Sequence, residues 1–260
     1  MKKYILFLIS LVSGISSTFA ECAMSGMQFF PEQKEISLNS MFIIQGYSMS
    51  QNTINSFKNR NVYLESENGE LIVLNLQELL KGQMELTQAI FCSSAELKPN
   101  TTYFLKYSNQ TDNESNAMMQ YNSETRKKEK VYWKTTNEKS VALLNPNLKI
   151  EFETTETVLY GCGPFANAIF NIKNKVASEI WYKTEVVNLT TKENTYFYIK
   201  EWNRKLNVGH DMCSGAFVFE NKGEYKFRFT PMNIDGKSIT TTDWTTFKRP
   251  FMRDKNPLGF

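Results

Sequence analysis

The sequence predicts an all-β chain made of two antiparallel β-sandwiches in tandem. Short runs of β-branched and aromatic residues recur along the whole chain, with turn-forming residues between them. No amphipathic helical pattern longer than two turns interrupts these runs. The length of 260 residues suits two domains of ordinary size once a leader is removed.

The N-terminus has the composition of a secretory signal peptide. Two lysines precede an apolar run at 4–12, and a small-residue cleavage signal ends at Ala20. We therefore expect residues 1–20 to be removed and the mature chain to be exported to the periplasm, the cell surface or the medium of a bacterium. A lipoprotein signal is an alternative because Cys22 follows closely, although Glu21 stands where such signals have a small residue. No later segment is apolar over the roughly 18 residues that a membrane helix needs.

The charge of the chain disfavours nucleic acid as a partner. The formal net charge of +3 includes the two lysines of the leader, so the mature chain is nearly neutral. A nucleic-acid binder usually carries a strongly basic face. We expect an unidentified macromolecular partner, either a protein or an envelope glycan.

The four cysteines all lie in the predicted mature chain, and their number is even. In an oxidising compartment this indicates two disulfides, for which three pairings are possible. Two domains that are each closed within themselves favour Cys22–Cys92 and Cys162–Cys213. A zinc site is the alternative, but the usual CxxC spacings are absent.

The first half contains a strong hairpin signal. The runs 62–67 and 70–74 are β-prone and are joined by Asn68-Gly69, the pair that a type I′ turn prefers. The segment Leu76–Leu80 predicts one helical turn that ends at Gly82. Further strands are predicted at 42–44, 103–107 and 131–135.

The second half repeats the same pattern. Tyr225, Phe227 and Phe229 alternate with charged residues, which is typical of a half-buried strand. A turn at Asn233–Gly236 leads to a closing strand at 244–247. Other strands are predicted at 168–172, 180–187 and 195–200. We place the domains at 21–140 and 141–250, followed by an irregular tail at 251–260.

The segment Leu97–Tyr103 (LKPNTTY) resembles the Leu-x-Pro-x-Thr-x-Tyr segment of fibronectin type III and bacterial immunoglobulin-like domains. In those families the tyrosine hydroxyl bonds back to the nearby backbone, as a tyrosine corner. The run 131–136 is similar to the closing strand of such a domain, and 223–225 and 233–236 are similar to the last hairpin of a second one. The resemblance implies an immunoglobulin-like fold and no function. The cysteines depart from it, because they fit no standard pairing around a central tryptophan.

A second departure is a long polar insert at 108–130, between the predicted sixth and seventh strands of the first sandwich. Its composition is typical of mobile loops, and loops at the ends of a rigid sandwich often carry recognition. We expect Met118, Met119 and Tyr121 to be exposed there and to anchor a partner. The alternative is a surface loop without a function.

No catalytic residue is predicted. His210 is the only histidine, and it lies in a glycine-rich segment with Asp211, Cys213 and Ser214. Cys213 is expected to be oxidised, and Ser214 lacks the G-x-S-x-G elbow of a serine nucleophile. The segment is therefore interpreted as a turn that presents a disulfide, and the protein is not expected to be an enzyme.

Metal and cofactor sites are also not predicted. The run Asp112-Asn113-Glu114 is rich in oxygen ligands but lacks the loop pattern that binds Ca²⁺. Glu201 has no second placed carboxylate for glycoside hydrolysis. A carbohydrate-binding module would instead need an exposed aromatic row from Trp181, Trp202 and Trp244.

These observations predict an exported, non-enzymatic binding or scaffolding protein that recognises another macromolecule through sandwich loops or a strand edge. A carbohydrate-binding module protein is one alternative. A secreted hydrolase with accessory sandwiches is another, although no third domain or paired-carboxylate signature is present.

Overall fold

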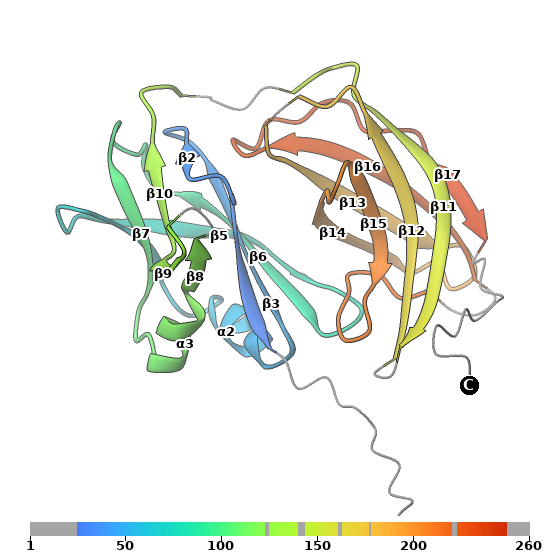
Figure 1. Ribbon diagram of the computed structural model, residues 1–260, viewed down its shortest axis with the longest axis horizontal. Coiled ribbons are helices and arrows are strands. Elements are labelled where there is room, and N and C mark those ends of the chain that lie inside the picture. The colour runs from blue at the N-terminus through green and yellow to red at the C-terminus, as the bar shows by residue number, and fades with distance from the viewer. Residues whose placement is uncertain are drawn as a thin grey trace, which may run out of the picture.

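The computed structural model describes residues 25–122, 125–139, 144–160, 163–176, 178–219 and 223–248. The predicted signal peptide at 1–20, the domain boundary near 140 and the tail at 251–260 lie outside the described residues, wholly or in part. The described chain is all-β, with several antiparallel sheets and two short α-helices (Figure 1). None of its helices is long and apolar enough to cross a membrane. We call the described residues up to 139 the first half and those from 144 the second half.

The first half forms one eight-stranded sheet. All neighbours pair antiparallel except β10 and β2, which are parallel. Only four residues separate β1 from β2, yet these strands lie at opposite edges of the sheet, so the sheet curls around its own core. The order is β1 (Gly26–Phe30), β3 (Met41–Tyr47), β6 (Leu86–Ser93), β5 (Leu71–Lys81), β4 (Val62–Ser66), β7 (Thr102–Tyr107), β10 (Tyr132–Thr135) and β2 (Glu35–Ile36).

The predicted hairpin at Asn68-Gly69 is confirmed, but its turn is not of type I′, because Asn68 does not adopt the positive φ that such a turn requires. Strands β4 and β5 pair across it, and Gly69 adopts a φ of 82°, which costs a residue without a Cβ little. The helical turn predicted at Leu76–Leu80 is wrong, because these residues belong to β5. A bulge between Leu76 and Glu78 interrupts the alternation of side chains between the two faces of the sheet. The sequence therefore shows no period-two pattern at this point.

The link between β3 and β4 contains the 3₁₀ turn η1 (Ser48–Ser50) and the helix α2 (Gln51–Ser56). Ile54 is the buried residue of α2 and packs into the core of the first half. The helix thereby covers one end of the curled sheet.

Tyr103 makes the backbone contact that its sequence motif predicts. Its ring is fully buried at the start of β7, and its hydroxyl accepts a hydrogen bond from the backbone N–H of Lys98 at 2.9 Å. This bond fixes the loop before β7 to the strand that follows it.

The second half contains two antiparallel sheets. Phe170 on β12 packs edge-on against Phe227 and Phe229 on β16, with ring centroids 4.5 and 4.9 Å apart, so side chains of both sheets share one core. Tyr225, Phe227 and Phe229 are all buried, as their alternation predicted. One sheet has the order β11 (Lys149–Tyr160), β12 (Gly163–Lys173) and β15 (Lys205–His210); the other has β14 (Asn194–Lys200), β13 (Ile180–Asn188), β16 (Glu224–Asn233) and β17 (Thr245–Lys248).

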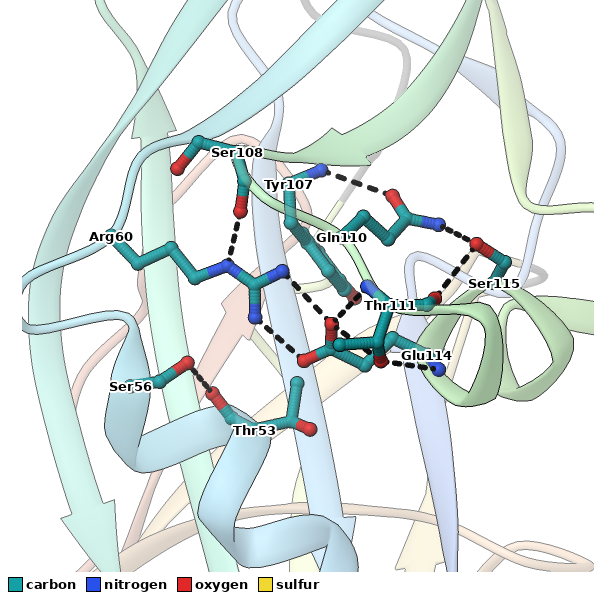
Figure 2. A network of polar contacts seen from close by, with 9 residues as sticks. All are labelled: Thr53, Ser56, Arg60, Tyr107, Ser108, Gln110, Thr111, Glu114 and Ser115. Carbon is teal, nitrogen blue, oxygen red and sulfur yellow. Dashed lines mark hydrogen bonds and ion pairs between the residues drawn. The ribbon is translucent and has the colours of Figure 1, made fainter.

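The insert at 108–130 contains regular structure. It contains α3 (Asp112–Ala117) and the hairpin of β8 (Met119–Asn122) and β9 (Lys127–Lys130). A capping box between Thr111 and Glu114 starts the helix. The guanidinium of Arg60 holds both oxygens of Glu114, at 2.6 and 2.9 Å, and donates to the carbonyl of Ser108 (Figure 2). This ion pair anchors the insert to the first half.

The predicted Cys22–Cys92 disulfide is wrong, because Cys92 carries a free thiol. Gly26 pairs with Tyr47 at one end of β3, whereas Cys92 pairs with Met41 at its other end, about 20 Å away along the strand. Three residues separate Cys22 from Gly26, and the four Cα–Cα steps between them span at most about 14 Å, which is shorter than this distance. Cys213 is disulfide-bonded, and Cys22 and Cys162 lie outside the described residues. The pairing Cys162–Cys213 stays a prediction.

Candidate binding cavity between the two halves

The two halves are held together by hydrogen bonds to main-chain groups in separate places. The N–H of Met41 donates to the carbonyl of Ile234 at 2.7 Å. At the tip of the β5–β6 hairpin, Met84 and Gly215 exchange two bonds, at 3.1 and 2.7 Å. A third contact is made by Glu179, whose carboxylate accepts from the backbone N–H groups of residues 32 and 33. These bonds fix the orientation of one half relative to the other.

A cavity of about 740 Å³ lies between these contacts. Its floor is the outer face of β1, β3 and β6 in the first half, and its walls are β14, β15 and the turn at 211–216 in the second. Pockets of this size at the junction of two structural units commonly bind ligands. Its apolar and aromatic lining includes Phe30, Ile43, Tyr47, Leu86, Trp181, Tyr198 and Ile199.

Three glutamines form a ladder across the floor of the cavity. Gln28, Gln45 and Gln88 stand in register on the adjacent strands β1, β3 and β6. Gln45 donates to Gln28 at 2.8 Å, and Gln88 donates to Gln45 at 2.7 Å. The amide of Gln88 also bonds the main chain of Tyr198 on β14, donating to its carbonyl at 2.7 Å and accepting from its N–H at 3.2 Å. We call these three residues the glutamine ladder.

Strands β14 and β15 open around the cavity like a fork. They begin as a tight hairpin in which Trp202 and Lys205 exchange two backbone bonds at 2.9 Å. Asn203 and Arg204 turn the chain with φ of 51° and 60°, as a type I′ turn requires. Beyond this pair the strands separate, because β14 joins the four-stranded sheet and β15 the three-stranded one. We call this opening the β14–β15 fork.

The fork presents main-chain groups to the cavity. The N–H and carbonyl of successive residues in a strand point to opposite edges. Those of Tyr198 point away from β13, to Gln88. Those of Lys200, two residues further on, therefore point to the same outward edge of β14. On β15, the carbonyl of Gly209 accepts from Phe217 on the outward side, so Asn207 also faces outward. No described residue pairs with the outward main-chain groups of Lys200 and Asn207.

His210 lies in the wall of the cavity but does not form a catalytic set. Its ring is buried, and its Nδ1–H donates to the backbone carbonyl of Asp211 at 2.9 Å. A Ser-His-Asp arrangement needs this nitrogen to bond a carboxylate instead. A Cβ added to Gly215 would lie 2.2 Å from the Cβ of His210, so the turn packs directly on the histidine.

The charges of the cavity wall are few. The ammonium group of Lys200 is paired with Glu32. Burial raises the pKa of the Asp211 carboxyl, an effect that His210 opposes. The lining is therefore mostly amide, main-chain and apolar surface.

The insert residues predicted as partner anchors are placed differently from the expectation. Met118 is buried in the hydrophobic core, so the prediction that it is exposed is wrong. Met119 is half-buried, and Tyr121 is 65% exposed. The structure does not bring these residues to the cavity between the halves.

The other sequence candidates do not form sites among the described residues. Glu114, from the oxygen-rich run at 112–114, is occupied by Arg60, and no described group of three or more His, Cys, Asp or Glu residues is placed to hold a metal ion. Trp181 is buried, Trp244 is half-buried against the cations of residues 226 and 228, and Trp202 alone is largely exposed. These three tryptophans therefore do not form the aromatic row that a carbohydrate-binding module needs.

Comparisons with known proteins do not identify a family. No family model matches the sequence, and no curated protein matches it. Among solved structures, a pullulanase complexed with maltotriose from Anoxybacillus sp. LM18-11 is 9% identical, with a TM-score of 0.25. The match covers 82% of this chain and 24% of the pullulanase chain. A cytokine receptor complex is 8% identical with a TM-score of 0.26, covering 86% of this chain and 96% of that one. A DUF4785 family protein from Legionella pneumophila is 8% identical with a TM-score of 0.22, covering 85% and 56%. Scores this low carry no argument, so the all-β assignment rests on the strands themselves.

Proposed function

We propose that this chain is an exported, non-enzymatic binding protein that holds another macromolecule in the cavity between its two halves. The observation that carries the proposal is the cavity itself, about 740 Å³ in volume and lined by both halves. It combines an aromatic and apolar surface with a small number of oriented polar groups, which is the usual composition of a binding site.

The proposal includes an immunoglobulin-like β-sandwich in each half. In support, the second half divides its strands into β11-β12-β15 and β14-β13-β16-β17, with Phe170 bridging the two sheets. In the first half, the buried Tyr103 bonds the backbone N–H of Lys98, as the tyrosine corner of such domains does. We further propose that Cys213 pairs with Cys162 within the second sandwich.

The arrangement of His210 favours binding over catalysis. Its Nδ1–H donates to the main-chain carbonyl of Asp211 and not to a carboxylate. Acid-base catalysis near neutral pH usually needs a histidine oriented by a carboxylate or another placed titratable group.

Binding at the cavity is tested by pull-down from native envelope and medium fractions with three forms of the chain. Gln28→Trp places a bulky ring at the rim of the cavity, at an exposed position where no core packing is lost. Tyr121→Ala removes the exposed aromatic of the insert. We expect the intact chain and Tyr121→Ala to retain the same partner and Gln28→Trp to lose it. Loss with Tyr121→Ala alone would move the site to the insert and refute the cavity proposal.

Export is tested separately by N-terminal sequencing of the protein recovered from the cells and the medium. The proposal expects a mature chain that starts at Glu21. A lipid-modified Cys22 would instead support the lipoprotein signal, and an intact Met1 in the recovered protein would contradict export by cleavage.

A further inference from the structure

The β14–β15 fork indicates the chemical class of the partner. Lys200 and Asn207 each direct a main-chain N–H and carbonyl into the opening, where no described residue pairs with them. Continuing the hairpin from the pair of Trp202 and Lys205 would place these two residues opposite each other, but the strands have already separated into different sheets. The fork therefore presents two short unpaired strand edges that face each other, one on β14 and one on β15.

We propose that the cavity takes an extended polypeptide segment, which adds as a short strand to the β14–β15 fork. This inference rests on the proposed function and specifies its ligand. Main-chain hydrogen bonds to Lys200 and Asn207 would supply affinity, and alternate side chains of the segment would enter the cavity or face out of it.

The structure itself contains an example of the pairing. The carboxamide of Gln88 bonds both the N–H and the carbonyl of Tyr198. Tyr198 lies two residues before Lys200, on the same edge of β14. A primary amide has the same donor and acceptor as a peptide group. The edge of β14 thus already pairs with a peptide-like group at its next outward position.

The glutamine ladder extends this amide chemistry across the floor. Each carboxamide passes a hydrogen bond to the next, and the ladder ends at Gln28, whose amide oxygen accepts from Gln45. Gln28 is exposed at the rim, and no described residue accepts from its amide N–H₂. This group is a free donor for a carbonyl oxygen of the segment.

The side chains that enter the cavity are expected to be uncharged. Lys200 is already paired with Glu32 and so offers no free charge to the segment. The rest of the floor consists of amides and of apolar groups such as Phe30 and Ile43. A buried charge without a partner costs far more than an apolar or amide side chain in such surroundings.

The test begins with two substitutions at Asn207 in the full chain. Asn207→Pro removes the outward N–H without breaking a ladder bond, at an edge position where proline is tolerated. Asn207→Ala removes only the side chain and is the matched control. A displayed library of random ten-residue peptides and a glycan array are the probes. We expect peptides that bind the intact chain and Asn207→Ala, and that bind Asn207→Pro at least about fivefold more weakly, since one hydrogen bond is lost.

A second measurement keeps the proposal falsifiable if Asn207→Pro does not fold. A selected peptide is synthesised with single N-methyl groups, each of which removes one main-chain donor. Strand addition predicts that methylation at alternate positions weakens binding to the intact chain at least about fivefold, and that the positions between are tolerated.

The outcomes separate this inference from the proposed function. Any of three results would overturn strand addition. These are a library that gives no binding peptide, a selected peptide that is equally sensitive to N-methylation at every position, and peptides that bind Asn207→Pro as well as the intact chain. If the pull-down partner nevertheless depends on an open cavity at Gln28, the cavity still binds a macromolecule. Glycans retained by the intact chain and lost by Gln28→Trp would then identify that macromolecule as carbohydrate.

Discussion

Replacing Glu114 by glutamine tests how the insert is attached to the first half. The carboxylate of Glu114 lies against the guanidinium of Arg60, and the side chains are only 12% and 14% exposed. The same carboxylate accepts from the backbone N–H of Thr111 at 2.9 Å. Glutamine keeps the size of the side chain and removes its charge. The substitution therefore removes the ion pair without creating a cavity.

The expected loss follows from the pKa of Glu114. The hydrogen bond from Arg60 is the main cause that lowers this pKa from 4.5 to about 2. At about 1.4 kcal/mol for each unit, the ionised carboxylate stabilises the folded state by about 3 kcal/mol, and the solvent screening that remains at the ion pair reduces the figure to about 2 kcal/mol. Because folding lowers the pKa, this stabilisation is complete above pH 4.5 and is lost as the pH falls towards 2.

Urea unfolding of both proteins at several pH values measures this effect. At pH 7 we expect Glu114→Gln to unfold with about 2 kcal/mol less free energy than the parent, and the difference to shrink as the pH falls from about 4.5 towards 2. Glu96→Gln is the matched control, since its pair with Lys139 is exposed and is expected to contribute less than about 0.5 kcal/mol. Limited proteolysis within 108–130 reports the insert directly, in case it opens before the rest of the chain. Equal losses from both substitutions, or a difference that does not change with pH, would refute the anchoring role.

Three further substitutions test the packing. Tyr103→Phe removes the hydroxyl that accepts from the N–H of Lys98 and is expected to cost about 1–3 kcal/mol in urea unfolding; no change would mean that water replaces the bond. Phe170→Ala removes the ring that joins the two sheets of the second half and is expected to cost about 3–5 kcal/mol, whereas a loss below about 1 kcal/mol would contradict a shared core. Gly209→Ala places a Cβ 2.0 Å from a carbonyl oxygen of β12 and is expected to lower the thermal midpoint far more than Gly69→Ala, whose Cβ has nothing within 4 Å; similar midpoints would contradict the close packing of β12 and β15.

Local patterns in the sequence predicted the features that depend on few neighbouring residues. The Asn68-Gly69 hairpin and the buried face of Tyr225, Phe227 and Phe229 each follow from one short segment. The contact of Tyr103 with Lys98 also lies within six residues. Turn chemistry and period-two alternation are enough to specify such features.

The candidate site has no comparable local signal. The glutamine ladder joins residues 28, 45 and 88 to Tyr198. In the sequence, each glutamine by itself looks like an ordinary polar residue on the exposed face of a strand. Only the pairing of β1, β3 and β6 aligns them, and only the second half gives them a partner. The burial of Met118 was not predicted for a related reason, because the residues around it in the sequence are polar and give no local sign of a core position.

The contacts around the cavity determine how it can act. The halves are joined at Met41 and Ile234, at Met84 and Gly215, and at Gln88 and Tyr198, so contacts from both halves surround the space between them. Opening the cavity as a hinge would break hydrogen bonds to main-chain groups in each of these places. The cavity is therefore formed before a ligand arrives, and binding does not have to meet the cost of ordering the two halves. If the proposed strand addition occurs, a preformed β-edge inside a fixed cavity would discriminate by the shape of an extended main chain, and the fork, rather than the exposed insert, would select the partner.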